Sequence, residues 1–502
     1  MRRRRFLAAA GAALTMTPLR FATAAPPPDS LLDMARAAAR RPYVATTTPL
    51  PAPFAGLDYD AYRGIRPQPG SAGMLPIGPD YAVDLLPPGL YFPDPVRVEL
   101  ATGSTMREVR FSPSLFDFAP RYFDEVPQEA PGAGFSGLRL RHPLNTAGRM
   151  DEVLVVQGAS YFRAVGAAMV YGLSARAVAL GTGGAEPEEF PHFTRLRVHE
   201  PQADSVRLEG MIDSPALTGH LDLVMRPGAE TEMDISVHVF PRRDIRDIGV
   251  APLTSMYLKG PLRAAVSDDF RPRVHDSEVL IIENGAGEQL WRPIANPARI
   301  ETSAFSDAGP QSFGLYQTAR RFEDYEDSEA RYHYRPSAIV RPKGDWGRGA
   351  VTLVEIPTSD EFMDNVVAFW RPEEQLSAGT VHRFDYLLTW TAAAPAQRSV
   401  TRILQTRSGR EHDQPGTRRF VIDFTGPAVG LAPDLSTSGA GARVTEVSLF
   451  QLPSSRGTRA TFLLTPDTAA AVELRLVLRD RAGRAASPVW LHRWTRARDG
   501  GV

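Results

Sequence analysis

The chain has 502 residues, more than a single hydrophobic core usually spans, so its length predicts two domains. Its formal net charge of −1 gives no overall field that would attract nucleic acid or an anionic membrane, and no nucleic-acid partner is predicted. The chain has no cysteine, which excludes thiol redox catalysis, thiolate metal sites and disulfide bonds.

The N-terminus has the pattern of an export signal. A basic run, Arg2–Arg5, precedes Phe6 and a short apolar stretch, as in a twin-arginine signal. Ala22-Thr23-Ala24 supplies an A-x-A cleavage site, so residues 1–24 are predicted to be removed; an ordinary Sec signal is the alternative. No later apolar run approaches the roughly 20 residues that a membrane helix requires, so no stable membrane insertion is predicted after export.

One helix is predicted at residues 30–40, with Ser30 as its cap, Asp33 in its first turn and Pro42 as its stop. Beyond it, short runs with alternating apolar and polar residues predict half-buried strands, and the chain is predicted to be all-β. These runs are residues 138–142, 233–240, 384–388, 420–424, 444–450, 460–464 and 472–478.

A domain boundary is predicted where this periodicity stops. Residues 392–398 form an alanine- and proline-containing linker after the strand that ends at Trp390. Residues 25–391 are predicted to be a large β-sandwich. Residues 399–502 have the length and strand spacing of a small immunoglobulin-like sandwich.

Two patterns that could indicate cofactor or metal binding lack the sequence context that such sites require. Residues 132–137 match G-x-G-x-x-G by letters, but a strand follows them where a dinucleotide site requires a helix. The histidines are scattered, and His275-Asp276 has no evident third or fourth ligand. The sequence therefore predicts neither a cofactor nor a metal site.

Two stretches rich in carboxylates and aromatic residues, 269–278 and 355–370, are candidates for catalysis. Glycoside cleavage commonly uses one protonated carboxyl to donate to the leaving oxygen and a second to activate water. Aromatic rings that could lie against sugar faces occur between them, among them Trp291, Tyr332 and Trp346. By themselves, these patterns are more typical of solvated loop acids and core rings than of a catalytic site.

A series of uncommon strings resembles one family. They are residues 158–164, 171–176, 213–215, 251–256, 344–347 and 354–358, in this order along the chain. Together they resemble the glucan biosynthesis proteins of the G and D type, which shape osmoregulated periplasmic glucans. The twin-arginine signal favours the D type.

The resemblance implies a large N-terminal mutarotase-like β-sandwich and an immunoglobulin-like C-terminal domain in a periplasmic protein. It also implies an inverting β-1,2-glucanase in which Asp364 is the general acid and Asp276 the base. Glu361 and Tyr332 match positions that hold the substrate or organise the acid, and His275, Trp291 and Trp346 are taken as further substrate contacts. Because a general acid must hold its proton, Asp364 is expected in the more perturbed environment of the two aspartates.

The expected partner is a β-glucan polysaccharide, with contact to the inner-membrane glucan synthase as a further expectation; the oligomeric state is not predicted. Two other functions remain open. One is a non-catalytic glucan-binding or assembly factor, which has no need of an isolated acid. The other is a mutarotase-like epimerase acting on free sugar.

Overall fold

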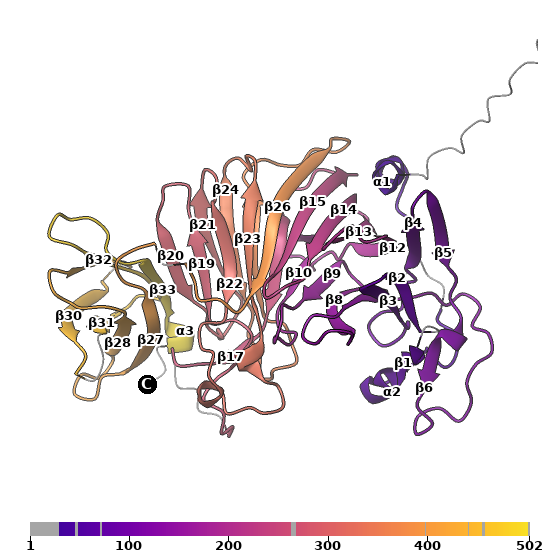
Figure 1. Ribbon diagram of the computed structural model, residues 1–502. Coiled ribbons are helices and arrows are strands. Elements are labelled where there is room, and N and C mark those ends of the chain that lie inside the picture. The colour runs from indigo at the N-terminus through magenta and orange to yellow at the C-terminus, as the bar shows by residue number, and fades with distance from the viewer. Residues whose placement is uncertain are drawn as a thin grey trace, which may run out of the picture.

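The computed structural model describes residues 30–45, 49–70, 73–262, 268–396, 398–439, 441–453 and 457–499. The predicted signal segment, residues 1–24, lies outside these ranges, as does residue 397 of the predicted linker. The regular secondary structure of the described chain is almost entirely strand, which confirms the all-β prediction (Figure 1). Within these ranges, no helix has the length and apolar character needed to span a bilayer.

The helix predicted at the start of the mature chain is confirmed as α1 (Leu31–Ala39). The Ser30 Oγ accepts the backbone N–H of Asp33 at 3.3 Å, so the predicted cap satisfies one of the free donors of the first turn. Leu31 and Ala35 are buried, and Ala35 packs with Met211 and Phe240 on strands of the second sheet described below. α1 thus covers the outer face of that sheet.

Two large sheets form the main body. The first has the order β2 (Met74–Gly78), β3 (Tyr81–Leu86), β7 (Gly137–His142), β8 (Asp151–Gln157), β9 (Tyr161–Ala164), β10 (Ser174–Arg176), β16 (Ile248–Ser255), β25 (Val366–Pro372), β24 (Gly349–Glu355) and β21 (Glu301–Asp307), with β11 (Val178–Leu180) also paired to β16. The main-body part of the second has the order β20 (Gln289–Pro293), β19 (Val279–Glu283), β22 (Ser312–Tyr316), β23 (Ser337–Lys343), β26 (His382–Thr391), β15 (Thr231–Pro241), β14 (Leu217–Arg226), β13 (Val206–Asp213), β12 (His192–His199), β4 (Arg97–Thr102) and β5 (Thr105–Val109).

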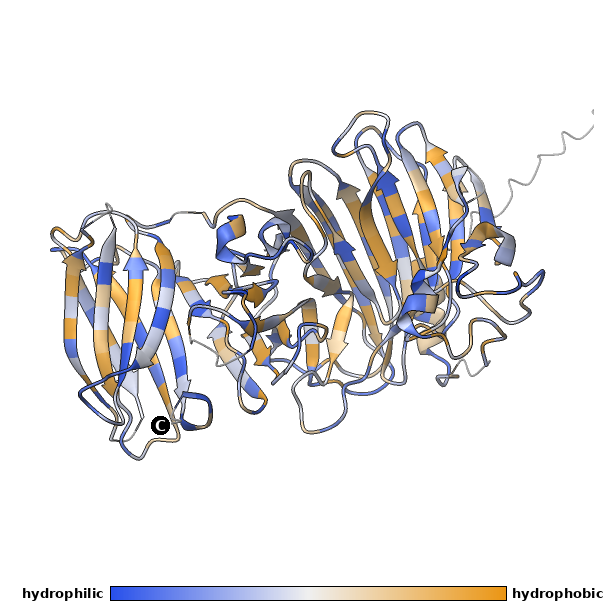
Figure 2. Cartoon of the chain, turned by 90° about the horizontal axis from the view of Figure 1, so that it is seen from below, coloured by the Kyte–Doolittle hydropathy of each residue, from blue (hydrophilic) through white to orange (hydrophobic). Residues whose placement is uncertain are grey.

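The apolar face of each sheet supplies one core between them. In β15, the residues Met233, Ile235, Val237 and Val239 are buried, while the residues between them are more accessible. All four belong to the largest apolar cluster, to which β3, β7 and β24 of the first sheet also contribute. Figure 2 shows the resulting bands of apolar and polar residues along the strands. This two-residue alternation explains why the sequence predicts strands here.

Smaller elements complete the main body. They are α2 (Tyr59–Arg63), the pair β1 (Ile65–Pro67) and β6 (Phe116–Phe118), the pair β17 (Tyr257–Lys259) and β18 (Val274–His275), and the short 3-10 helices Pro113–Leu115, Phe322–Asp324 and Tyr332–Tyr334.

The C-terminal strands form two sheets at one end of the molecule (Figure 1). One has the order β27 (Ile403–Arg410), β28 (Arg418–Phe424), β31 (Thr458–Thr465) and β30 (Arg443–Gln451). The other, β29 (Ala432–Ser438), β32 (Ala471–Arg479) and β33 (Val489–Thr495), continues the second large sheet, because β33 pairs in parallel with β20. The short helix α3 (Arg496–Asp499) follows β33.

Candidate active site

Asp276 follows β18 and is almost completely buried, with 4% exposure. Its backbone N–H donates to the Met256 carbonyl at 2.8 Å, and a guanidinium N–H of Arg335 donates to its Oδ1. Burial raises the pKa of Asp276 above its usual value, and the positive charge of Arg335 opposes that rise. The site therefore contains a desolvated carboxyl with one strong cationic partner.

Asp364 lies in the loop between β24 and β25, and its side chain is 28% exposed. Arg163 of β9 approaches it, with Nη2 at 3.3 Å from Oδ2, and the Ser174 Oγ accepts the Arg163 Nε–H at 2.7 Å. The more buried of the two aspartates is thus Asp276, which reverses the expectation that Asp364 has the more perturbed surroundings.

The two aspartates lie on either side of one short segment. Asp276 bonds to Met256, and the next residue, Tyr257, is bonded to Asn365, the neighbour of Asp364. The negative charge of Asp364 is also among the causes that raise the pKa of Asp276, so the two carboxyls are close enough to interact.

Glu361 and Tyr332 belong to the same cluster. The Tyr332 hydroxyl donates to Glu361 Oε2 at 3.1 Å, and Arg271 Nη1 lies 2.7 Å from that oxygen. The Arg335 guanidinium lies 4.2 Å from the centroid of the Tyr332 ring, which connects this pair to Asp276. Tyr332 is 1% exposed and burial raises its pKa, so it acts as a fixed hydroxyl donor rather than as an open surface for a sugar.

His275 is fully buried beneath this cluster, which corrects its prediction as a substrate contact. Its ring stacks on Tyr257, with centroids 5.3 Å apart and planes 8° apart, and meets the edge of Tyr325. Burial, helped by the nearby charge of Arg273, lowers the pKa of His275 to about 3. The imidazole is therefore a neutral core ring.

Trp291 and Trp346 are not brought to the cluster, so their prediction as sugar contacts is also corrected. Trp291 is 7% exposed and packs in the apolar cluster shared with the C-terminal strands. Trp346 packs edge-on against Phe384 and Tyr386 in the loop that precedes β24. Because β24 runs from Gly349 to Glu355, that loop lies at the end of the strand opposite Asp364, about 20 Å away.

Exposed apolar side chains do flank the cluster. Phe362 is 91% exposed and Met363 50% exposed in the loop that carries Asp364. Phe270, at 79% exposure, precedes Arg271, which pairs with Glu361 of the same loop. These side chains, rather than the two tryptophans, offer accessible apolar surface near the aspartates.

Sequence reasoning missed the cations that hold the acids. Arg163, Arg271 and Arg335 come from segments far apart in sequence, and no local pattern assigns an arginine to a distant carboxylate. Arg163 occurs inside one of the strings that carries the family resemblance, which was its only signal.

In the described ranges, no group of three or more histidine or acidic side chains is arranged to hold a metal ion.

Comparison with known proteins gives one family. Residues 28–494 match the model of the family described as "Periplasmic glucan biosynthesis protein, MdoG". The chain is 40% identical to Glucans biosynthesis protein G of Vibrio cholerae, covering 93% of this chain and 86% of that protein. It is 39% identical to Glucans biosynthesis protein G of Shewanella frigidimarina, covering 96% and 87%.

A solved structure, a galactose mutarotase related enzyme from Lactobacillus acidophilus, aligns with 53% of this chain and 94% of its own. Its identity is 9% and its TM-score 0.22, values at which the likeness carries no argument about function.

The relatives named above are of the G type, so the D type favoured by the signal segment is corrected to the G type. The extent of the family match and the identity to these relatives show that the chain belongs to the periplasmic glucan biosynthesis protein family.

Proposed function

We propose that this protein is exported to the periplasm and hydrolyses the β-1,2-linked backbone of glucan with inversion at the cleaved bond. The observation that carries the proposal is the meeting of Asp276 and Asp364 on either side of the Met256–Tyr257 segment. Inverting glycosidases use two carboxyls in this way, one to protonate the leaving oxygen and one to activate water.

Asp276 suits the role of base. Burial raises its pKa, which makes its carboxylate a stronger proton acceptor than a solvated aspartate. Arg335 meanwhile stabilises the ionised form that a base requires. A water held beside Asp276, directly or through a second water, would be the nucleophile.

Asp364 is accessible enough to act as the acid, but its ion pair with Arg163 does not suit that role. It is the more exposed aspartate and lies beside Phe362 and Met363, where a sugar could stack. A nearby guanidinium stabilises the ionised carboxylate, whereas a general acid must be in its protonated form. The proposal therefore requires that bound glucan separates Arg163 from Asp364.

The same contact favours a second function, glucan binding without hydrolysis. With Arg163 in place, Asp364 is one half of an ion pair, and the cluster could organise a binding surface instead of a reaction. Under this reading, the protein guides nascent glucan, and contact with an inner-membrane glucan synthase would be part of that role. The division at residues 392–398 into a glucan-acting domain and an accessory domain is proposed under both readings.

The test is to incubate the purified mature protein with linear β-1,2-glucan and to follow the products by NMR. Hydrolysis with inversion releases oligosaccharides whose new reducing ends are first α and then equilibrate. Saturable binding with no products would instead support the binding function. Products that first appear as the β anomer would contradict inversion.

A further inference from the structure

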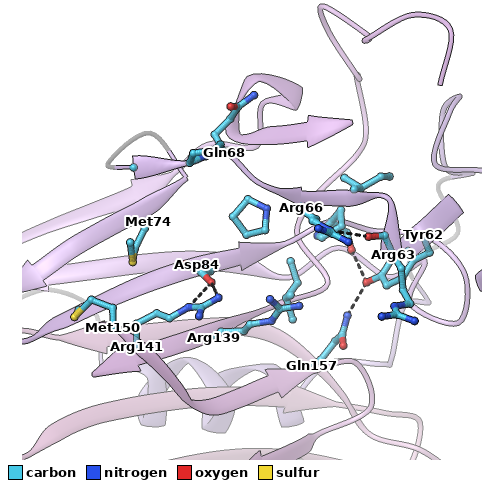
Figure 3. Close-up of a pocket in the computed structure, with 16 residues that line it drawn as sticks. Tyr62, Arg63, Arg66, Gln68, Met74, Asp84, Arg139, Arg141, Met150 and Gln157 are labelled. Atoms are coloured by element: carbon cyan, nitrogen blue, oxygen red, sulfur yellow. Dashed lines mark hydrogen bonds and ion pairs between the residues drawn. The ribbon is translucent and has the colours of Figure 1, made fainter. Parts of the chain in front are cut away.

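A polar cavity lies apart from the aspartates, in the N-terminal part of the main body (Figure 3). Its volume is about 580 Å³, within the range of roughly 300–1,000 Å³ that small-molecule sites occupy. None of the residues of the aspartate cluster lines it.

The floor of this cavity is the outer face of the first sheet. In β7, Leu138 and Leu140 are fully buried in the main core, so Arg139, which lies between them, and Arg141, which follows Leu140, point to the opposite face. In β3, Asp84 lies on that face as well, and its carboxylate is only 3% exposed. The guanidiniums are thus mounted on paired strands rather than on loops.

The roof is supplied by α2 and β1, which bring Arg63 and Arg66 over the floor. Figure 3 shows these two side chains with Arg139 and Arg141 around the same space. One wall is fixed by Gln157, whose Nε2 donates to the Tyr62 hydroxyl at 2.8 Å. The cavity is therefore formed before any ligand enters.

The charges of the lining do not cancel. Asp84 forms an ion pair with Arg141, whose Nε lies 2.7 Å from Oδ2 of Asp84. Outside the lining, Glu152 Oε1 lies 3.5 Å from Arg139 Nε. Arg63 and Arg66 are exposed and form no ion pair with a carboxylate of the described ranges; the Arg66 Nε–H donates to the Arg63 carbonyl at 3.4 Å, and the Arg63 guanidinium lies over the Tyr59 ring. This excess of positive charge is local, because the whole chain has a net charge of −1.

We propose that this cavity binds a small organic anion through the guanidiniums of Arg63, Arg66 and Arg139. Guanidinium groups pair with phosphate and carboxylate oxygens through two parallel hydrogen bonds, so a phosphate ester or a carboxylate is the matching chemistry. Asp84 keeps Arg141 in place, Arg63 and Arg66 have no carboxylate partner in the described ranges, and Arg139, with Nε 3.5 Å from Glu152, completes the set. This site is independent of the proposed hydrolysis, since it shares no residue with the aspartate cluster.

The test is calorimetric titration of the mature protein with inorganic phosphate, glucose 6-phosphate and glucuronate, with glucose as the neutral comparison. We expect at least one of the three anions to bind saturably and glucose not to bind. The double variant Arg63→Ala/Arg66→Ala should weaken that binding roughly tenfold or more. Both side chains are exposed, so the variant should fold, and its thermal unfolding checks this.

The matched control is Arg348→Ala/Arg484→Ala, which removes the same charge from two sites with 78% and 81% exposed side chains. It should leave anion binding unchanged. Equal weakening by both double variants, or no saturable binding of any anion, would overturn the proposal. Vesicles of phosphatidylglycerol test a lipid headgroup as the ligand. The proposal would also be overturned if the protein bound these vesicles but none of the small anions, and if Arg63→Ala/Arg66→Ala abolished vesicle binding; the arginines would then form a membrane contact.

Discussion

Three carboxylates of the candidate active site each meet a guanidinium from another part of the chain. Asp276 meets Arg335, Asp364 meets Arg163 and Glu361 meets Arg271. Charge-assisted hydrogen bonds of this kind hold an acid in one orientation and offset part of the cost of removing it from water. At the scale of single residues, the arginines therefore determine which face of each acid remains available to a substrate.

The buried imidazole of His275 gives a prediction for stability against pH. Its folded pKa is about 3, below the ~6.5 of an unfolded histidine, so the unfolded chain binds the extra proton between these values. The stabilisation is complete above pH 6.5 and is lost as the pH falls towards 3. Between pH 7 and pH 5, His275 should contribute a loss of about 2 kcal/mol.

Replacing His275 by Leu should remove that loss, although it also costs stability at pH 7 because the stacking on Tyr257 changes. Urea unfolding at pH 7 and pH 5 measures the difference for the variant and for the wild type. His412→Leu, at an exposed histidine, is the control and should leave the pH dependence unchanged. An unaltered difference in His275→Leu would show that His275 is already protonated in the folded protein at pH 5.

Among the elements, the loop that carries Asp364 is fixed by one buried side chain. The Asn365 Oδ1 accepts the Tyr257 N–H at 2.8 Å, and its Nδ2 donates to the carbonyls of Tyr257 and Ile356 at 3.1 and 2.8 Å. Asn365 thus joins β17 to both ends of the loop and determines where Asp364 lies.

Replacing Asn365 by Ala should destabilise the protein by about 3 kcal/mol, because it leaves buried backbone groups without partners. If the loop positions the acid, kcat on β-1,2-glucan should fall further than glucan affinity does. Asn284→Ala, which removes a similar set of bonds from an exposed turn, is the matched control. Loss of stability with kcat unchanged would show that Asn365 does not position Asp364.

The strands could be predicted because alternation is local, whereas the contacts of the site are not. The alternation of residues 233–240 predicts a strand, and these residues lie within β15. Trp291 and Trp346 were misassigned because an aromatic residue has the same sequence signal in a core as on a sugar-binding surface. His275 was misplaced for a similar reason, since its neighbour Asp276 reaches the site while its own ring turns into the core.

At the scale of the whole molecule, the predicted boundary near residue 392 does not divide the second sheet. β33 pairs with β20 through Trp291 and Trp490, and both rings lie in one apolar cluster that includes residues of the main body and of the C-terminal strands. The composition of the linker predicts where the main-body strands end and the C-terminal strands begin. It does not predict that β33 pairs with β20 and extends the second sheet.

Because of this shared cluster, the described regions should unfold together. Wild-type protein should show one calorimetric transition, and Trp291→Ala should destabilise it by about 3–5 kcal/mol and separate the C-terminal strands into a transition of their own. Trp346→Ala, in the main core away from this junction, should lower stability without separating the transitions. Two transitions in the wild type would contradict the coupling.

The central claim is that Asp364 transfers a proton to the leaving sugar, and turnover by Asp364→Asn tests it most directly. Asparagine keeps the shape of the side chain but has no transferable proton, so kcat on linear β-1,2-glucan should fall by roughly 10²–10⁴-fold with glucan affinity nearly unchanged. Asp360→Asn, at an exposed position of the same loop, should retain full activity. Wild-type turnover in Asp364→Asn, or equal losses of affinity and kcat, would contradict the claim.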